Sequence, residues 1–284
     1  MSITTIAHNP TYEGLLDLRA NVPYLTVDGE TLCLQLIKPQ WGSPEKKGFP
    51  LVLFIQGSGW TKPNQFWELP QLSLLAARGF VIASVTHRSC FTAPAPAFLR
   101  DVKAALRFLR KNAAEYDIDP ARVCAFGTSS GGNTALLLGL TADDPAYETA
   151  DHAGESTRVQ AVVDCFGPTD VDGMVAHWNA GTPSDDNLLY NLGGKDPEHF
   201  RGNLAKINPL NMIRPGQTLP PFLILHGDAD TLVPYDHSQR LYELLTGCGH
   251  EADLVRVEGA PHEGSFWSLP LLEIIFDFIQ RKLA

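Results

Sequence analysis

The stretch RVCAFGTSSGGNTALLLGL, residues 122–140, is the most informative segment of the sequence. It starts as a short apolar run at 122–126, passes through GTSSG at 127–131, and ends in residues with helical spacing. A G-x-S-x-G sequence between a strand and a helix is typical of a nucleophile elbow, a sharp turn that exposes the serine hydroxyl. Glycines are expected there because a Cβ would collide with the neighbouring helix and strand. The segment therefore predicts that Ser129 is a nucleophile.

Short apolar runs alternate with longer helical segments along the rest of the chain. The runs that we expect to be buried strands lie at residues 51–55, 80–85, 122–126, 159–164, 222–225 and 254–257. Residues 97–111 and 269–283 have the spacing of amphipathic helices. This alternation predicts an α/β fold, with a mostly parallel sheet covered by helices on both faces. Residues 22–27 and 31–37 flank Asp28-Gly29 and should add an antiparallel hairpin at one edge.

The chain is expected to form a single domain over residues 1–284, because neither an internal repeat nor a low-complexity linker divides it. One region, about residues 172–220, breaks the alternation: it is rich in glycine and proline and has little periodicity. Long irregular segments in a compact domain are often lids or binding loops. We therefore expect residues 172–220 to be an insertion that covers the active site.

Composition and charge limit the function classes. A net charge of −10 and a pI near 5.3 argue against nucleic acid or an anionic membrane as the partner, since both need basic patches. The sequence contains neither a signal-peptide pattern nor an apolar run long enough to span a membrane. The five cysteines are widely spaced, and none has metal-ligand spacing. These features predict a reduced, cytoplasmic protein without metal or other cofactor, and they leave a homodimer open.

A serine hydroxyl needs a base within hydrogen-bond reach, and nine histidines are available. His262 is favoured because its loop follows the last expected strand and so lies at the carboxyl edge of the sheet, where such sites form. Asp228 and Asp230, in the loop after 222–225, are both candidates for the orienting acid. His226 is a rival base, which we interpret as a structural residue of the same loop. Serine, aspartate, histidine is the chain order expected with a nucleophile elbow.

An oxyanion hole is the remaining requirement, because negative charge on the reacting carbonyl must meet preset N–H donors, each worth roughly 3 to 4 kcal/mol. FIQGSGW at residues 54–60 ends a strand in a loop of small residues, where backbone amides can converge. The residue after the nucleophile normally donates its amide as well, and here that residue is Ser130. Ser130 could itself be proposed as the nucleophile, but Ser129 holds the central position of the motif.

With these parts identified, the sequence resembles the α/β-hydrolase esterases of the hormone-sensitive-lipase-like kind. It is most similar to their small bacterial branch, which contains feruloyl and acetyl-xylan esterases. The resemblance runs from about residue 50 to the C-terminus and is carried by residues 101–105, 118–123, 127–132, 220–234 and 257–262. It implies that the acid is the aspartate before x-x-Val-Pro, which is Asp230. It also implies that the amides of Ser58 and Gly59 act as oxyanion donors beside that of Ser130.

The oxyanion loop departs from the family pattern His-Gly-Gly-Gly-Trp at two positions, where this chain has Gln56 and Ser58. Backbone donors survive a side-chain change if Ser58 holds the same dihedral angles. Gln56 can still hydrogen-bond to neighbouring backbone. Arg88 matches a position where the family usually has arginine, and we expect it to pair with Asp101 in a structural role.

The predicted function is hydrolysis of a small-molecule carboxylic ester through an acyl-enzyme. Two alternatives stay open: the same residues could cut an amide or peptide bond, or the fold could serve as a binding module without catalysis. A propeller-like domain that would select peptides is not indicated by the sequence, and a complete triad disfavours a pure binding module. Aromatic residues of the lid and catalytic loops are expected to wall the substrate pocket: Trp60, His177, Trp178, Tyr190 and Trp267.

Overall fold

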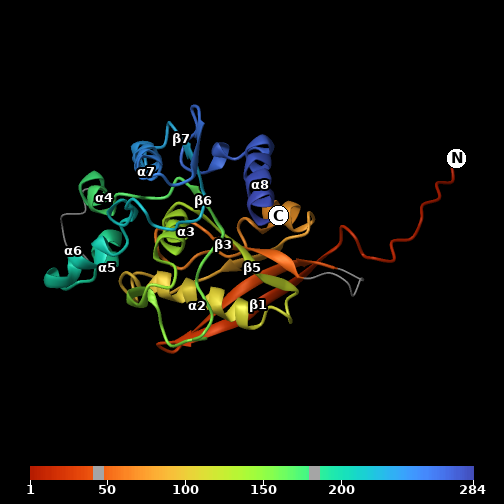
Figure 1. Ribbon diagram of the computed structural model, residues 1–284, viewed down its shortest axis with the longest axis horizontal. Coiled ribbons are helices and arrows are strands. Elements are labelled where there is room, and N and C mark those ends of the chain that lie inside the picture. Colours follow the sequence, from red (N-terminus) through yellow and green to blue (C-terminus); the bar gives the residue numbers. More distant parts are fainter. Residues whose placement is uncertain (41–47, 179–185) are drawn as a thin grey trace.

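The computed structural model describes residues 1–40, 48–178 and 186–284. The described residues contain an eight-stranded sheet with the strand order β1-β2-β4-β3-β5-β6-β7-β8 (Figure 1). The strands are β1 Leu16–Val27, β2 Glu30–Pro39, β3 Phe49–Ile55, β4 Val81–Val85, β5 Ile118–Thr128, β6 Ala161–Cys165, β7 Phe222–Gly227 and β8 Ala252–Val257. All strands from β3 to β8 run parallel to their neighbours in this group. The predicted mostly parallel sheet is therefore confirmed.

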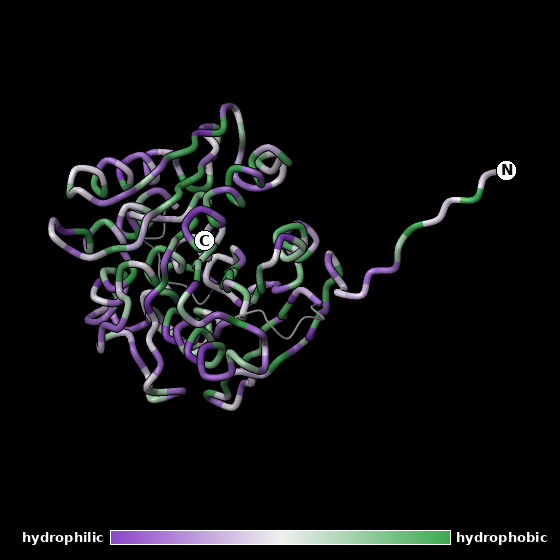
Figure 2. Tube along the Cα trace, turned by 45° about the vertical axis from the view of Figure 1, so that its right-hand side comes forward, coloured by the Kyte–Doolittle hydropathy of each residue, from purple (hydrophilic) through white to green (hydrophobic). Residues whose placement is uncertain are grey.

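The antiparallel edge is formed by β1 and β2, and β2 also pairs antiparallel with β4. Asp28 and Gly29 make the two-residue turn of the hairpin, with φ angles of 51° and 79°. Positive φ at both central residues is what a type I′ hairpin requires, and an Asp-Gly pair adopts it at low cost. The predicted hairpin is confirmed. The segment before β1 extends away from the body of the molecule (Figure 2).

Helices cover both faces of the sheet. The helices are α1 Leu69–Ala76, α2 Ala97–Lys111, α3 Ser130–Thr141, α4 Val171–His177, α5 Leu188–Gly193, α6 Pro197–Ala205, α7 Asp236–Gly247 and α8 Leu269–Leu283, with short 3₁₀ segments η1 Pro145–Tyr147, η2 Pro209–Asn211 and η3 Gly264–Phe266. α1 and α8 pack on one face, and α2, α3 and α7 pack on the other. The bounds of α2 and α8 agree with the two segments that the apolar spacing predicts. Every helix in the described residues is too short or too polar to cross a membrane.

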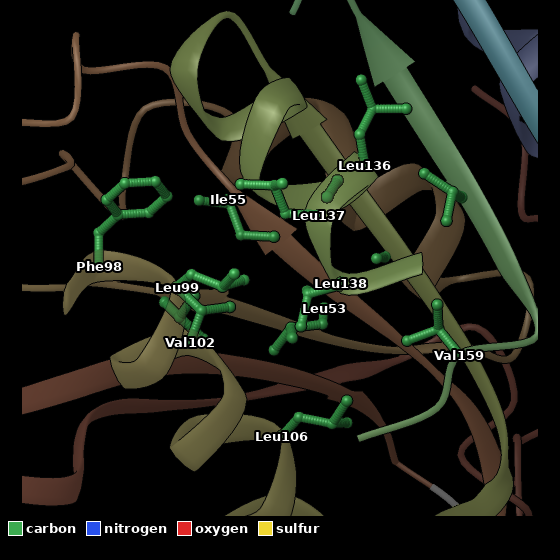
Figure 3. Close-up of a cluster of buried hydrophobic side chains, with 14 of the residues drawn as sticks. Leu53, Ile55, Phe98, Leu99, Val102, Leu106, Leu136, Leu137, Leu138 and Val159 are labelled. Atoms are coloured by element: carbon green, nitrogen blue, oxygen red, sulfur yellow. The ribbon is translucent and has the colours of Figure 1, made fainter. Parts of the chain in front are cut away.

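Two buried layers flank the sheet because successive side chains of each strand point to opposite faces. Leu53 and Ile55 of β3 face α2 and α3, whereas Val52 and Phe54 face α1 and α8. Burying one such side chain contributes about 1.5–3 kcal/mol. Figure 3 shows the first layer, in which Leu53 and Ile55 meet apolar side chains of α2, α3 and the β6 approach: Phe98, Leu99, Val102, Leu106, Leu136, Leu137, Leu138 and Val159.

The region at 172–220 contains most of α4, then α5, α6 and η2, and residues 179–185 lie outside the described residues. Its described helices have only six to nine residues. Helices this short do not complete enough turns to show clear apolar periodicity, which explains why they were not predicted. Leu189, Leu192 and Leu204 belong to the same buried cluster as α2 and α3. The described part of the region is therefore packed onto the main core.

Candidate active site

The turn between β5 and α3 holds Ser129 in an unusual backbone conformation, with φ 52° and ψ −123°. A non-glycine residue at positive φ costs roughly 1–3 kcal/mol, so the surrounding packing must impose it. An added Cβ on Gly127 would lie 2.0 Å from the carbonyl oxygen of Gly131, and one on Gly131 would lie 2.0 Å from that of Ile55. Glycine is therefore required at both positions for β3, β5 and α3 to meet this closely.

Three side chains that are far apart in the sequence meet at the carboxyl edge of the sheet. The His262 Nε2 atom lies 2.9 Å from Ser129 Oγ, and His262 Nδ1 lies 2.6 Å from Asp230 Oδ2. Because Nδ1 faces a carboxylate, it carries the proton, and Nε2 is left to accept the serine hydroxyl. The Asp230 side chain is fully buried, and that of His262 is 13% exposed. The structure brings together the three residues predicted as nucleophile, acid and base.

Asp230 is surrounded by hydrogen-bond donors. Its Oδ1 atom accepts from the amides of Leu232 and Val233 at 2.8 and 2.9 Å, and His226 Nε2 lies 3.1 Å from Oδ2. Burial alone would raise the pKa of this carboxyl. Hydrogen bonds from His226, His262 and the Val233 amide outweigh it and hold the pKa of Asp230 well below its usual value. Asp230 is therefore ionised at neutral pH, as an acid that orients a histidine must be.

The rival residues of the same loop have other partners. His226 is fully buried: its Nδ1 lies 2.7 Å from Ser238 Oγ and its Nε2 lies 2.9 Å from the Val233 carbonyl oxygen. Nε2 faces two acceptors, so it carries the proton, and Nδ1 accepts the Ser238 hydroxyl. Asp228 accepts from the Gly259 amide at 2.6 Å and pairs with Arg256. These contacts agree with the structural roles expected of His226 and Asp228.

The oxyanion loop lies against the nucleophile turn. The Gly57 amide donates to Thr128 Oγ1 at 2.8 Å, and the Ser58 amide donates to the hydroxyl of Ser130 at 2.9 Å. In the part of the chain that the structure describes, the amides of Gly59 and Ser130 donate to no protein acceptor. The hydrogen bond at the Ser58 amide was not anticipated from the sequence. The one sequence feature that could have indicated this hydrogen bond is Ser130, the serine directly after the nucleophile.

Gln56 and Arg88 make the structural contacts that the sequence suggests. Gln56 Oε1 accepts from the Asn64 amide at 2.7 Å, which fixes the loop backbone. Arg88 binds Asp101 through Nε and Nη2 at 3.0 and 2.8 Å and also reaches Asp28. The expected Arg88–Asp101 pair is present.

Trp60 differs from the expected pocket wall. It is fully buried, its indole N–H donates to Asn133 Oδ1 at 3.3 Å, and its ring lies 6.5 Å from that of Phe98. Its positive φ of 56° turns the side chain into the core beside α2 and α3. Trp60 is therefore a core residue under the oxyanion loop. Sequence alone could not show this, because the direction of a side chain in a glycine loop depends on tertiary packing.

His177 and Trp178, at the end of α4, lie against the loop that carries Asp230. His177 Nε2 is 3.3 Å from the carbonyl oxygen of Thr231, and the Trp178 indole N–H donates to that of Leu232 at 2.9 Å. The following α5 reaches the oxyanion loop, since Leu188 Cδ2 would lie 3.2 Å from a Cβ on Gly59. Trp178 and Leu188, which lie before and after residues 179–185, thus contact the Asp230 loop and the oxyanion loop.

Tyr190 and Trp267, the remaining predicted aromatics, have different surroundings. The Tyr190 hydroxyl donates to the Lys195 carbonyl at 3.2 Å within the 172–220 region. The Trp267 indole N–H donates to Glu263 Oε2 at 3.0 Å. Phe166, which was not predicted, lies much closer to the site: its ring is 4.6 Å from that of His262 in an edge-on arrangement. Its position directly after a buried strand could have indicated it.

A metal site is not formed by the described residues, which contain no group of three or more His, Cys, Asp or Glu side chains suited to an ion. The side chains that meet at the carboxyl edge are a serine, a histidine and a carboxylate. A serine, a histidine and a carboxylate in such an arrangement are suited to nucleophilic acyl transfer.

The fold and the side chains that meet at the carboxyl edge of the sheet define an α/β-hydrolase. Comparison with known proteins shows the family within this class. Residues 37–245 match the BD-FAE family, and the chain belongs to this family. It is 28% identical over 226 residues to esterase LipC of Mycobacterium tuberculosis, a match that covers 76% of this chain and 53% of LipC. The chain spans about half the length of the curated relatives it matches.

Two solved structures are similar over nearly the whole chain. A truncated carbohydrate esterase from gut microbiota has a TM-score of 0.75 and 29% identity, covering 97% of this chain and 98% of that one. An esterase of Thermogutta terrifontis, Est2 with butyrate bound, has a TM-score of 0.75 and 25% identity, with 93% of each chain covered. These likenesses confirm the predicted fold class and the predicted resemblance to hormone-sensitive-lipase-like esterases.

Proposed function

We propose that the chain hydrolyses small carboxylic esters through an acyl-enzyme formed on Ser129. The observation that carries the proposal is the continuous hydrogen-bonded array of Ser129, His262 and Asp230 at 2.9 and 2.6 Å. The names of relatives and structural neighbours, which are esterases, support the same reaction class. Small-molecule esters suit the acidic net charge of −10 better than polyanions do.

The reaction proceeds in two halves. Ser129 Oγ attacks the ester carbonyl carbon while His262 Nε2 takes the hydroxyl proton, which gives a tetrahedral oxyanion. The imidazolium then protonates the alcohol oxygen, the C–O bond breaks, and the acyl group stays on Ser129. Water attacks the acyl carbon, gives its proton to His262, and Ser129 leaves with that proton. Ionised Asp230 holds the imidazole in one tautomer and stabilises its charged form.

The oxyanion is stabilised by the loop after β3 and the start of α3. The amides of Gly59 and Ser130 are direct donors, since both lack protein acceptors in the described residues. The Ser58 amide acts through Ser130, because it donates to the Ser130 hydroxyl. That hydroxyl can then turn its own hydrogen toward the oxyanion. An amide that polarises a hydroxyl makes the hydroxyl a stronger donor.

The substrate pocket belongs to the same single domain, and residues 172–220 act as its lid. Leu188 at Gly59 and Trp178 at the Asp230 loop bring this region to both sides of Ser129. His177 contacts the Asp230 loop, and Trp60 is buried beneath the oxyanion loop. The assignment of Tyr190 and Trp267 to the pocket wall rests on the sequence prediction. Butyrate in the Thermogutta esterase supports a short acyl chain for this enzyme as well.

Hydrolysis of p-nitrophenyl butyrate, compared with that of its p-nitroanilide analogue, tests the proposal. The wild-type chain should cleave the ester with a much higher kcat/KM than the anilide, because an amide carbonyl is less electrophilic and an anilide is a poorer leaving group than p-nitrophenolate. Ser129→Ala should lose at least about 10⁴-fold in kcat and keep its circular dichroism spectrum. Faster cleavage of the anilide would instead favour the amidase alternative, and an active Ser129→Ala would exclude Ser129 as the nucleophile.

A further inference from the structure

Asn133 is a fully buried residue in the first turn of α3, one helical turn after the proposed nucleophile. Its backbone N–H donates to the Ser129 carbonyl oxygen at 3.0 Å. Its side-chain Nδ2 donates to the carbonyl oxygens of Pro168 and Ile207 at 2.8 and 3.0 Å. Its Oδ1 accepts the indole N–H of Trp60 at 3.3 Å. One side chain therefore bonds three segments that are far apart in the sequence.

The partners of the Asn133 side chain determine its orientation and its chemical type. Two partners are carbonyl oxygens, which only accept, and the third is an indole N–H, which only donates. A primary amide matches this set, because its NH₂ group has two hydrogens to donate and its oxygen accepts. An apolar residue would leave all three buried groups unpaired, and an ionised aspartate would place acceptors against both carbonyls. The three contacts therefore favour an amide at position 133.

The hydrogen bond to Trp60 links α3 to the oxyanion loop. Trp60 directly follows Gly59, whose amide is one of the two proposed direct donors, and the other donor amide is that of Ser130 at the start of α3. Gly59 and Trp60 both have a positive φ, 60° and 56°. A tryptophan adopts such a conformation only where its surroundings impose it. Because the Trp60 indole is bonded to α3, the loop is held against the helix that carries the second donor.

The other two hydrogen bonds of Asn133 reach the loop after β6 and the end of the 172–220 region. Phe166 and Pro168 belong to the first of these, and the Phe166 ring lies 4.6 Å from that of His262. Ile207 lies just after α6 and is fully buried. These two contacts keep the Asn133 amide in place, so its oxygen presents a fixed acceptor to the Trp60 indole.

We propose that Asn133 is a positioning residue of the oxyanion hole, an inference that rests on the proposed ester hydrolysis. Asn133 acts through Trp60, by holding the Gly59 amide beside that of Ser130. The two amides must converge on one oxygen, and a displacement of about 1 Å can lower a rate by about 10²-fold. Loss of the Trp60–Asn133 hydrogen bond should therefore weaken binding of the transition state and leave binding of the ester almost unchanged.

Trp60→Phe tests this link, because it removes the indole N–H and keeps an aromatic ring in the core. Asn133 retains its hydrogen bonds to Pro168 and Ile207 in this variant. Its kcat on p-nitrophenyl butyrate should fall by about ten- to a hundredfold, with KM within about twofold of the wild-type value. Trp67→Phe is the matched control, since Trp67 is exposed and lies outside the oxyanion loop, and it should keep the wild-type kcat and KM.

Two ketones separate positioning of the donors from a general structural effect. 1,1,1-Trifluoropentan-2-one adds to a serine nucleophile and forms a tetrahedral oxyanion, whereas pentan-2-one binds as the unreacted carbonyl. In Trp60→Phe the inhibition constant of the trifluoroketone should rise by the factor by which kcat/KM falls, and that of pentan-2-one should not change. Full trifluoroketone affinity in folded Trp60→Phe, or an equal loss for both ketones, would overturn the proposal.

Asn133→Ala removes the acceptor itself, and its combination with Trp60→Phe shows whether the two residues act through one hydrogen bond. The double variant should bind the trifluoroketone about as well as Asn133→Ala alone, because the indole then has no acceptor left to lose. Additive losses would overturn the proposal. Should Asn133→Ala not fold, as judged by circular dichroism, the ketone comparison in Trp60→Phe decides.

The wild-type chain distinguishes failure of this inference from failure of the proposed function. A wild type that hydrolyses the ester and prefers the trifluoroketone, together with a Trp60→Phe variant that behaves identically, would overturn only the role of Asn133. A wild type that neither hydrolyses the ester nor binds the trifluoroketone more tightly than pentan-2-one would overturn both.

Discussion

At the scale of single residues, the two aspartates after β7 have different proposed roles: Asp230 orients His262, and Asp228 stabilises the loop. Both lie in the same loop, two positions apart, yet Asp230 contacts His262 and Asp228 contacts Arg256 and the Gly259 amide. The sequence limited the acid to these two residues, and the family resemblance favoured Asp230. The contacts of this loop depend on how β8 returns beside β7, which residue types alone do not show.

Asp230→Asn and Asp228→Asn form a matched pair for the proposed acid. An amide at position 230 would favour the wrong tautomer of His262, so kcat on p-nitrophenyl butyrate should fall by about 10⁴-fold with little change in KM. The same change at 228 should alter kcat by less than about tenfold, because Asp228 contacts Arg256 and the Gly259 amide at the loop surface and does not contact His262. Comparable losses in both variants would contradict the assignment of Asp230.

At the scale of elements, the sequence predicted the helices with clear apolar periodicity and the hairpin with characteristic turn residues. The β1–β2 hairpin, α2 and α8 were found because a turn dipeptide or about four helical turns of apolar spacing define them. The short helices α4 to α6 were not found, and Trp60 was placed in a pocket wall. In both cases packing against distant segments decides the structure. The Trp60 indole donates a hydrogen bond to Asn133 in α3, and Leu188 at the start of α5 packs against Gly59 in the oxyanion loop.

The junction of β3, β5 and α3 should tolerate no side chain at Gly131. A methyl group there would lie 2.0 Å from the Ile55 carbonyl oxygen, so Gly131→Ala should lower the free energy of unfolding by about 3 kcal/mol. Gly202→Ala in α6 is the control, because nothing lies within 4 Å of its added Cβ. It should stabilise the protein by about 0.5–1 kcal/mol. Urea denaturation of both variants measures these values, and a stable Gly131→Ala would be inconsistent with the close contact.

At the scale of the whole molecule, buried titratable groups set how stability varies with pH. Burial raises the pKa of Glu68 to about 8 and that of Asp164 to about 7. Burial lowers the pKa values of His87 and His237 to about 4. The histidines therefore favour folding as pH rises from 4 to about 6.5, while the two carboxyls oppose folding over the same rise. These contributions offset one another below pH 6.5.

Between pH 6.5 and 8 the two histidines are neutral in both the folded and the unfolded chain, so of these four groups the carboxyls alone still differ, Asp164 up to about pH 7 and Glu68 up to about pH 8. The unfolded chain has already released both protons there, whereas the folded chain releases them only near pH 7 and pH 8, so the free energy of unfolding should fall as pH rises through this interval. Glu68→Gln and Asp164→Asn should each flatten this decline. Urea denaturation at several pH values measures it, and a stability that rises with pH over this interval would show that the two carboxyls are ionised in the folded chain.

The most direct measurement of the proposed chemistry is covalent labelling with a fluorophosphonate, followed by intact-mass and peptide mass spectrometry. A serine activated by His262 should take up one phosphonyl group, which the peptide masses assign to Ser129, and His262→Ala should react far more slowly. A chain that stays unlabelled, or one that carries the label on Ser130 or elsewhere, would contradict the proposal that Ser129 is the nucleophile.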